Sequence, residues 1–304
     1  MLGTVFAGFT SVATSAFAES VDAANGSGAV FDSTRAPFAA LNNAHQIGPV
    51  TKLHYAPNGN FGTGRKAGVY LPGADGFNLA DLDTLTQLNS LPSGVKGLWY
   101  LGLCNGVESK FTETVGQFIG NSKLYGVFLI DEPDPTGRYK PRCSASNLEA
   151  EADWIHVNVP GAKVFITLMS LGTYKNPEYV NTYNTANTDI DLFGLDPYPC
   201  RKEFIGKEFP NGCDNNVIHA SVAAAEAWGI ATSQIVPVYQ AFGGGGYRAW
   251  ILPTAGEEEQ LLSIWGSLVP TPVFDFAYSW GSQERDHALG HSHALQAVFA
   301  VHNE

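Results

Sequence analysis

The sequence has few charged residues, few cysteines and, after its first residues, no long hydrophobic run. Charged residues make up 15% of the 304 residues, and acidic residues outnumber basic ones by 29 to 17. The resulting net charge of −12 would repel phosphate backbones and anionic membrane surfaces, so we expect neither nucleic acid nor lipid as a partner. The apolar content of 44% supports a large core and excludes a disordered or coiled-coil protein.

The chain begins with an uncharged run of small and apolar residues, MLGTVFAGFTSVATSAFA, which ends in an Ala-x-Ala site at Ala16 and Ala18. Such a run is typical of a secretory signal peptide. We therefore expect residues 1–18 to be removed on export to the extracellular space or periplasm, which leaves residues 19–304 as a mature protein without membrane attachment. The run lacks the Lys or Arg that usually begins a signal, so a truncated signal and a membrane anchor stay open as alternatives.

Four cysteines are present: Cys104, Cys143, Cys200 and Cys213. An even number fits an oxidising compartment and allows three pairings. Cys200 with Cys213 would close a short polar loop, which leaves Cys104 to pair with Cys143, and we expect these two disulfides. A zinc site is the competing interpretation, but the spacings include no C-x-x-C pair and no histidine lies close by. We predict no metal and no other cofactor.

Short apolar runs rich in β-branched and aromatic residues recur along the chain and predict eight strands, at residues 29–31, 50–55, 95–101, 125–130, 163–169, 190–195, 235–239 and 274–280. Amphipathic stretches lie between most of them and predict helices, at residues 78–88, 109–119, 146–157, 217–228 and 256–268. No internal repeat or low-complexity linker divides the chain. This alternation predicts one (β/α)8 barrel domain, with an open doubly wound sheet as the alternative.

Polar and aromatic residues gather where the predicted strands end. Asp131 and Glu132 follow YGVFLI, and Gln240 follows VPVY. Asp196 follows DLFGL, and Trp280 ends FDFAYSW. In a barrel these strand ends form one rim, and (β/α)8 enzymes carry their chemistry on that rim. This convergence favours the barrel over the open sheet and predicts a functional site.

Asp131 and Glu132 are adjacent carboxylates. Neighbouring anions raise each other's cost of ionisation, so one of them can stay protonated near neutral pH and serve as an acid. Cleavage of a glycosidic bond requires such an acid. The alternative interpretation is that the two residues fill a solvated turn or cap the following helix.

Four further positions suit the binding of a sugar. Asp196 and Tyr198 share one strand parity, so both would face the barrel mouth. Gln240 would supply an amide donor, and Trp280 a flat apolar platform for the C–H face of a sugar ring. Three residues at the ends of earlier predicted strands are weaker candidates, each of them more typical of a structural residue: His54, Tyr55 and Tyr100.

The motifs DEP after the fourth strand, GLDPYP on the sixth, QAF on the seventh and YSW on the eighth resemble the rim motifs of (β/α)8 glycoside hydrolases, in the broad clan that includes the β-galactosidases. In that clan a Glu that ends the fourth strand is the acid/base, usually preceded by Asn. The resemblance implies that Glu132 is the proton donor, with Asp131 in place of the Asn. The clan's nucleophile is a Glu that ends the seventh strand, where this chain has Gln240.

The adjacent Asp–Glu pair also resembles the signature of hexosaminidases in which the 2-acetamido group of the substrate attacks the anomeric carbon. That resemblance implies that Asp131 orients the acetamido group while Glu132 protonates the leaving oxygen, without a protein nucleophile. The alternative within the same class uses Asp196 as nucleophile or base opposite Glu132.

Together these features predict a secreted glycoside hydrolase, without cofactor, that acts on an extracellular oligo- or polysaccharide. Glu132 would be the general acid, and Asp131 or Asp196 its partner. The competing class is a non-catalytic carbohydrate-binding barrel, which the absence of a Glu after the seventh strand and the aromatic rim would also fit.

Overall fold

The computed structural model describes residues 47–137, 141–168, 183–205 and 211–304. The expected signal peptide at residues 1–18 and the strand expected at residues 29–31 lie outside the described residues. No helix among the described residues has both the length and the hydropathy to span a membrane.

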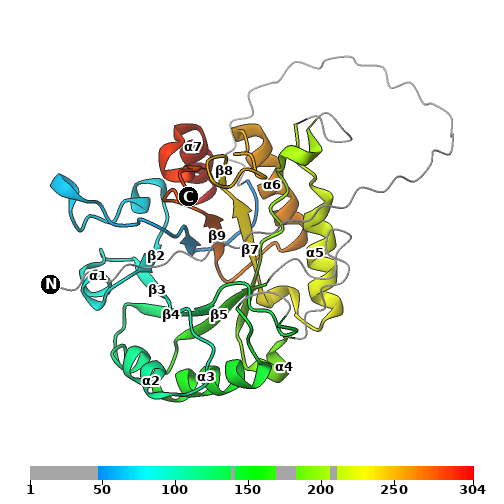
Figure 1. Cartoon of the computed structure of the whole chain (residues 1–304). Helices are drawn as coiled ribbons and strands as arrows, with labels where there is room; N and C mark the ends of the chain where they lie inside the picture. The colour runs from blue at the N-terminus through cyan, green and yellow to red at the C-terminus, as the bar shows by residue number, and fades with distance from the viewer. Residues whose placement is uncertain (1–46, 138–140, 169–182, 206–210) are drawn as a thin grey trace, which may run out of the picture. The chain divides into compact units, whose positions relative to one another are not determined.

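Eight parallel strands close into a barrel, which confirms the predicted fold class (Figure 1). Each strand pairs with its neighbour in the chain, and the last pairs with the first. The strands are β1 (His54–Tyr55), β2 (Leu79–Leu82), β3 (Lys96–Tyr100), β4 (Leu124–Ile130), β5 (Lys163–Leu168), β6 (Leu192–Leu195), β7 (Ile235–Gln240) and β9 (Asp275–Tyr278). Two short strands, β8 (Phe242–Gly243) and β10 (His287–Ala288), form a separate antiparallel pair.

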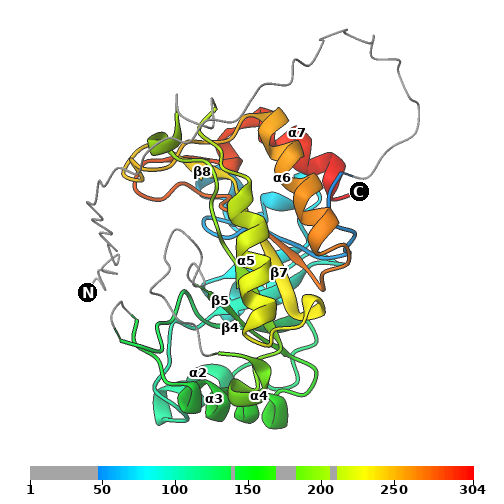
Figure 2. The ribbon, with the colours of Figure 1, turned by 90° about the vertical axis from the view of Figure 1, so that its right-hand side faces the viewer.

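Helices surround the barrel: α1 (Leu85–Ser90), α2 (Ser109–Gly116), α3 (Ala145–Asn158), α4 (Thr185–Thr188), α5 (Asn216–Ala227), α6 (Ala255–Leu268) and α7 (His293–His302). In the ribbon views α2, α3 and α4 lie on the side of β4 and β5, and α5 and α6 lie beside β7 (Figures 1 and 2). The side chains before α1, α3, α6 and α7 cap these helices, as Thr254 does by accepting the backbone N–H of Glu257 at 3.3 Å.

The barrel interior is filled by one apolar cluster in which phenylalanine is frequent. Its buried members include Phe128, Phe165, Phe274 and Phe276. Gly194 on β6 belongs to this packing, because a Cβ there would lie 2.8 Å from the Phe165 ring. The remaining core lies between the strands and the helices and is the larger of the two. This two-layer core is typical of a (β/α)8 barrel.

One predicted helix is wrong. Residues 78–88 form β2, a turn and then the start of α1. Leu79, Leu82, Leu85 and Leu88 recur every three residues and suggest one amphipathic helix, but Leu79 faces the barrel interior while Leu82 and Leu88 face the helix layer. All eight strands of the barrel, from β1 to β9, lie within the described residues.

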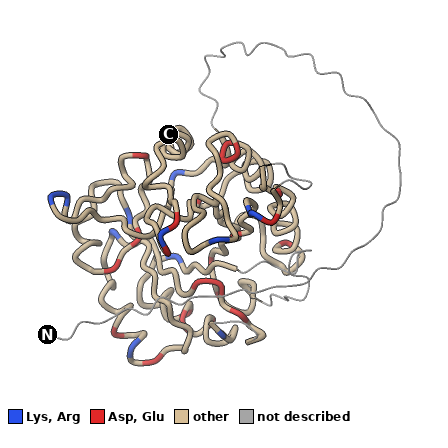
Figure 3. Tube along the Cα trace, turned by 45° about the horizontal axis from the view of Figure 1, so that its top comes forward, with Lys and Arg blue, Asp and Glu red and all other residues tan. Residues whose placement is uncertain are grey.

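Both predicted disulfides are present, Cys104–Cys143 and Cys200–Cys213. They fit a protein of an oxidising compartment. In Figure 3 the Lys and Arg residues of the described chain lie in separate short segments among acidic ones.

Candidate active site

A β-bulge aims Asp131 into the barrel mouth. Phe128 faces the interior, and strict alternation would turn Leu129 out, Ile130 in and Asp131 out. The pairing of β4 with β5 shifts register between Phe128 and Ile130, so that Leu129 and Ile130 both join the outer core. Asp131 consequently lies on the interior side, where such a bulge is a frequent device next to active sites.

Thr167 on β5 contacts both adjacent acids. Its hydroxyl accepts the backbone N–H of Glu132 at 2.9 Å and donates to Oδ1 of Asp131 at 2.5 Å. Glu132 has a φ of 42°, in the left-handed region that a residue with a Cβ rarely adopts. Backbone strain of this kind is common at active sites and requires support from neighbouring residues. Thr167, with 2% of its surface exposed, supplies such support.

Asp196 completes a group that we call the carboxyl cluster: Asp131, Glu132 and Asp196. Asp196 follows β6 on the same parity as Gly194, whose missing side chain leaves room for Thr167 beside it. The carboxyl groups of Glu132 and Asp196 hydrogen-bond each other. Residues from β4 and β6, far apart in the chain, therefore meet at one rim, as the sequence predicted.

Burial raises the pKa of every member of the carboxyl cluster, and neighbouring charges raise those of Glu132 and Asp196 further. Solvent reaches Asp131 and part of Glu132. Protein atoms nevertheless surround both carboxyl groups so closely that the loss of hydration is the largest influence on each pKa. Burial and then the charge of Asp131 raise the pKa of Glu132 to about 7, against the effect of its hydrogen bond with Asp196. The pKa of Asp196 lies well above its usual value because of burial and then the charges of Glu132 and Asp131. For Asp131, burial raises the pKa and the Thr167 hydroxyl opposes the rise.

Aromatic side chains line the cluster on the side of β6 and β9. The ring of Tyr198 lies 5.0 Å from that of Phe242 and 5.9 Å from that of Tyr278, between centroids. Burial raises the pKa of Tyr198 and Tyr278, and the charge of Asp131 raises both further, which places the two rings next to the cluster. Tyr198, like Glu132, has a positive φ, of 37°.

Tyr100 is also at the site, as the sequence suggested. It ends β3, and 45% of its surface is exposed. Its ring packs edge-on against Phe128 with 5.0 Å between centroids, and its phenol lies beside the backbone amide of Asp131.

Asp81 is a site residue that the sequence did not indicate, and it pairs with Tyr55, a weaker candidate from the sequence. The Tyr55 hydroxyl donates to Oδ1 of Asp81 at 3.0 Å, and the backbone N–H of Asn58 donates to Oδ2 at 2.9 Å. The charges of Asp81 and Asp131 both raise the pKa of Tyr55, after burial, so this pair lies near the carboxyl cluster. Asp81 was missed because its strand was taken for a helix. Thr167 was missed because its strand shows only apolar neighbours.

Gln240 is not available to a sugar. It is fully buried, its Oε1 accepts the N–H of Cys200 at 2.8 Å, and its Nε2 donates to the carbonyls of Cys200 and Ile251, each at 3.0 Å. The amide therefore holds the segment after β6, next to the Cys200–Cys213 disulfide. Its burial corrects the assignment of Gln240 as a binding residue.

Trp280 is likewise buried in the core, with 8% of its surface exposed. Its ring packs edge-on against Phe77 at 6.3 Å, and Phe77 packs against Phe299 of α7. The flat platform predicted for a sugar is therefore covered by protein.

His54 lies between the barrel and α7, away from the carboxyl cluster. Its Nδ1 contacts Oδ1 of Asp275 at 2.9 Å, and Nε2 of His302 contacts Oδ2 at 2.7 Å. Among the described residues these three form the only group whose atoms could surround a metal ion. However, the other ring nitrogen of His302 faces the carbonyl of Ile47 at 2.6 Å, so both nitrogens face acceptors and the ring is doubly protonated. A buried imidazolium–carboxylate pair explains the contacts without a metal.

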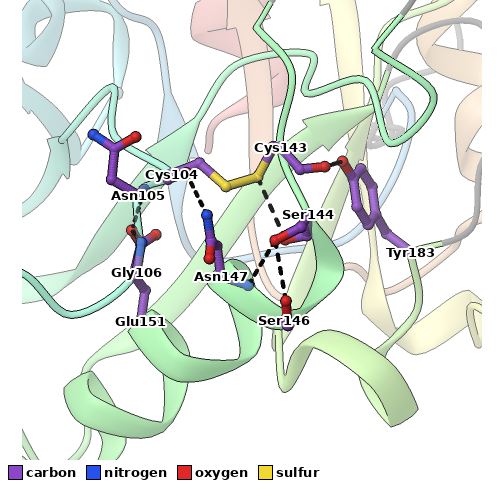
Figure 4. The surroundings of a disulfide bond; sticks show 9 residues. All are labelled: Cys104, Asn105, Gly106, Cys143, Ser144, Ser146, Asn147, Glu151 and Tyr183. Atoms are coloured by element: carbon purple, nitrogen blue, oxygen red, sulfur yellow. Dashed lines mark hydrogen bonds between the residues drawn. A yellow bond between two sulfur atoms is a disulfide. The ribbon is translucent and has the colours of Figure 1, made fainter.

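A disulfide joins two rim loops beside the site. Cys104 follows β3 and Cys143 precedes α3, so their bond ties the loop after β3 to the loop that follows Asp131 (Figure 4). Asn147 of α3 donates to the carbonyl of Cys104 at 2.9 Å, and the Tyr183 hydroxyl donates to the carbonyl of Cys143 at 2.7 Å.

Comparisons with known proteins identify the fold. No family model matches the chain, and no curated protein sequence is significantly similar to it. Among solved structures, a fungal endo-β-N-acetylglucosaminidase of glycosyl hydrolase family 18 is 12% identical, with a TM-score of 0.50 over 83% of this chain and 96% of that one. The C-terminal domain of a putative chitinase from Desulfitobacterium hafniense is 9% identical, with a TM-score of 0.51 over 77% and 92%. These similarities establish the shared fold.

Proposed function

We propose that the chain is a glycoside hydrolase in which Glu132 is the general acid and Asp131 its partner carboxylate. The observation that carries the proposal is the contrast between these two neighbours. Glu132 has a pKa raised to about 7, so it still holds a proton near neutral pH. Burial raises the pKa of Asp131 too, but Asp131 accepts a hydrogen bond from Thr167, which favours its ionised form. Glycoside hydrolases commonly use two carboxyl groups, of which one is protonated and the other ionised.

We infer a substrate that carries 2-acetamido groups, such as a glycan of N-acetylglucosamine. Two fold relatives with TM-scores of at least 0.50 are an endo-β-N-acetylglucosaminidase and a domain of a putative chitinase. The buried amide of Gln240 occupies the place of the usual nucleophile, which favours a reaction in which the substrate supplies its own. The exposed ring of Tyr100 and the half-buried ring of Tyr198 would pack against the C–H faces of sugar rings.

The proposed reaction proceeds in two steps. Glu132 gives its proton to the glycosidic oxygen while the acetamido carbonyl oxygen forms a bond to the anomeric carbon and the leaving sugar departs. Asp131 remains ionised and accepts the acetamido N–H, which stabilises the positive charge on the cyclic intermediate. Water then attacks the anomeric carbon as its bond to the acetamido oxygen breaks and restores the acetamido group. Glu132 recovers its proton from that water, and the product keeps its anomeric configuration. Asp196 orients Glu132 through their hydrogen bond.

The test is hydrolysis, followed by reducing-end release, of α- and β-linked glycans with and without 2-acetamido groups. We expect cleavage of the acetamido glycans only, and about a 10²- to 10⁴-fold loss of turnover in Glu132→Gln with glycan affinity retained. If glycans bind but none is cleaved, the proposal of an enzyme is wrong and the chain is a carbohydrate-binding barrel. Cleavage that survives Asp131→Asn but not Asp196→Asn would transfer the partner role to Asp196.

A further inference from the structure

The hydroxyl of Thr167 has a fixed direction of hydrogen bonding. The backbone N–H of Glu132 can only donate, so at 2.9 Å the Thr167 oxygen accepts from it. The hydroxyl hydrogen is then free for another partner, and Oδ1 of Asp131 lies 2.5 Å away. The hydroxyl donates there, which stabilises the ionised form of Asp131. One side chain thus contacts the backbone of the acid and the carboxylate of its partner.

The rest of the carboxyl cluster must hold a proton. Two carboxyl groups can hydrogen-bond each other only if at least one of them is protonated. Glu132 and Asp196 interact in this way, so the pair shares a proton, while the hydrogen bond from Thr167 favours the ionised form of Asp131.

We propose that Thr167 is the positioning residue that keeps the charge on Asp131 and the proton in the Glu132–Asp196 pair. The inference rests on the proposed function, because this distribution is the one in which Glu132 can act as the acid. Thr167 also contacts the one residue of the pair with a left-handed backbone, and so fixes where the acid points.

No other described group takes over this role. The titratable side chains that interact with the charge of Asp131 come from several strands and are all acids or phenols: Glu132, Asp196, Tyr55, Tyr100, Tyr198 and Tyr278. Asp81 adds a further acid on β2, and Tyr247 a phenol beyond β8. Among the described residues, only the Thr167 hydroxyl lowers the pKa of Asp131.

Two variants separate the hydroxyl from the packing of Thr167. A Cβ on Gly194 would lie 3.0 Å from Cγ2 of Thr167, so the methyl group fills the barrel interior. Thr167→Val keeps the shape and the methyl group but removes the hydroxyl. Thr167→Ser keeps the hydroxyl and removes the methyl group. A structural role would make the Ser variant the worse of the two, and the proposed role makes the Val variant the worse.

The experiment measures the pH dependence of kcat/KM for wild type and both variants on the glycan that wild type cleaves. In Thr167→Val the pKa of Asp131 rises, which moves the acid limb to higher pH. Above the acid limb Asp131 is ionised and its charge still raises the pKa of Glu132, so the basic limb should stay in place. We expect the profile to narrow by about one pH unit on its acid side, and kcat/KM at the optimum to fall about 10-fold to 100-fold. We expect Thr167→Ser to keep the wild-type profile.

A profile of wild-type width in a folded Thr167→Val, checked by its thermal unfolding temperature, would overturn the inference. Carboxyl titration by carbon-13 NMR on the same three proteins needs no substrate and separates this result from a failure of the proposed function. There we expect one carboxyl to titrate at higher pH in Thr167→Val than in wild type and Thr167→Ser. Identical titration curves would overturn the inference even if wild type cleaves no glycan.

Discussion

Two opposing influences decide the proton on Glu132: burial and the charge of Asp131 raise its pKa, while the hydrogen bond with Asp196 lowers it. The sum, a pKa of about 7, makes the acid form abundant at mildly acidic pH and scarce above neutrality. The proposed acid must be protonated in the free enzyme, so kcat/KM should fall as pH rises through this value. Activity would then be confined to the acidic side of neutral pH.

Asp131→Asn tests this dependence at the level of one side chain. The substitution keeps the shape and removes the charge, so the pKa of Glu132 should fall and the basic limb of kcat/KM should move down by about one pH unit. Turnover at the optimum should also fall about 100-fold or more, because the partner carboxylate is lost. The measurement is kcat/KM from pH 4 to 9. Asp196→Asn is the control, since its amide can still donate to Glu132 and the basic limb should stay in place. A basic limb that does not move in Asp131→Asn would contradict the assignment of Glu132 as the acid.

At the scale of elements, a disulfide stabilises the rim by joining the loops that follow two neighbouring strands. Cys104–Cys143 closes a loop of 39 residues in sequence and joins the segments after β3 and β4, whereas Cys200–Cys213 spans 13 residues within the segment after β6. In the chain-entropy description, a disulfide stabilises more when it closes a longer loop.

We therefore expect Cys104→Ser/Cys143→Ser to lose about 1 kcal/mol more unfolding free energy than Cys200→Ser/Cys213→Ser, out of a total loss of about 3 to 4 kcal/mol. Urea unfolding of both double variants gives the comparison. The first variant should also lose more turnover, because its disulfide fixes the loop that follows the proposed acid. Equal losses of unfolding free energy in the two double variants would contradict the argument from loop length in the unfolded chain.

Much of this architecture could be predicted from sequence where an apolar run ends in a polar residue. The ends of β4 and β6, with Asp131, Glu132 and Asp196, were found in that way. β2 was lost because four residues of strand and six of helix share leucines at one spacing. Gln240 and Trp280 were misassigned because a strand end does not reveal whether its side chain meets solvent or the next loop. The bulge in β4 leaves no pattern in the sequence, since it depends on pairing with β5.

At the scale of the whole molecule, several buried ionisable groups lie outside the site and make stability depend on pH. Burial alone would raise the pKa of Asp275, but its interactions with His54 and His302 lower it to about 2. Burial alone would lower the pKa of His302, but its hydrogen bond with Asp275 raises it above the usual value. The contribution of His302 is therefore complete below pH 6.5 and is lost as pH rises through its folded pKa. The contribution of Asp275 is complete above pH 3.8 and is lost as pH falls toward 2.

Glu258 on α6 acts in the same direction as His302. It is fully buried, neither carboxyl oxygen has a hydrogen-bond partner in the described part of the chain, and burial and then the charge of Glu257 raise its pKa to about 8. Because this pKa is above the unfolded value of 4.5, the protonated form is favoured on folding, and stability declines as pH rises from 4.5 to 8. Together with Asp275 and His302, this places the stability maximum near pH 4 to 5.

Glu258→Gln should flatten this decline. The variant has no proton to lose at position 258, so its unfolding free energy should fall less between pH 4.5 and 8 than that of wild type, by on the order of 3 kcal/mol. Urea unfolding at several pH values measures both slopes, and comparing slopes removes any constant cost of burying the amide. Glu259→Gln, an exposed change on the same helix, should leave the wild-type slope intact. If the slopes of wild type and Glu258→Gln coincide, Glu258 is already ionised in the folded protein, and the decline comes from other groups with raised pKa values, such as His302, Glu151 and the carboxyl cluster.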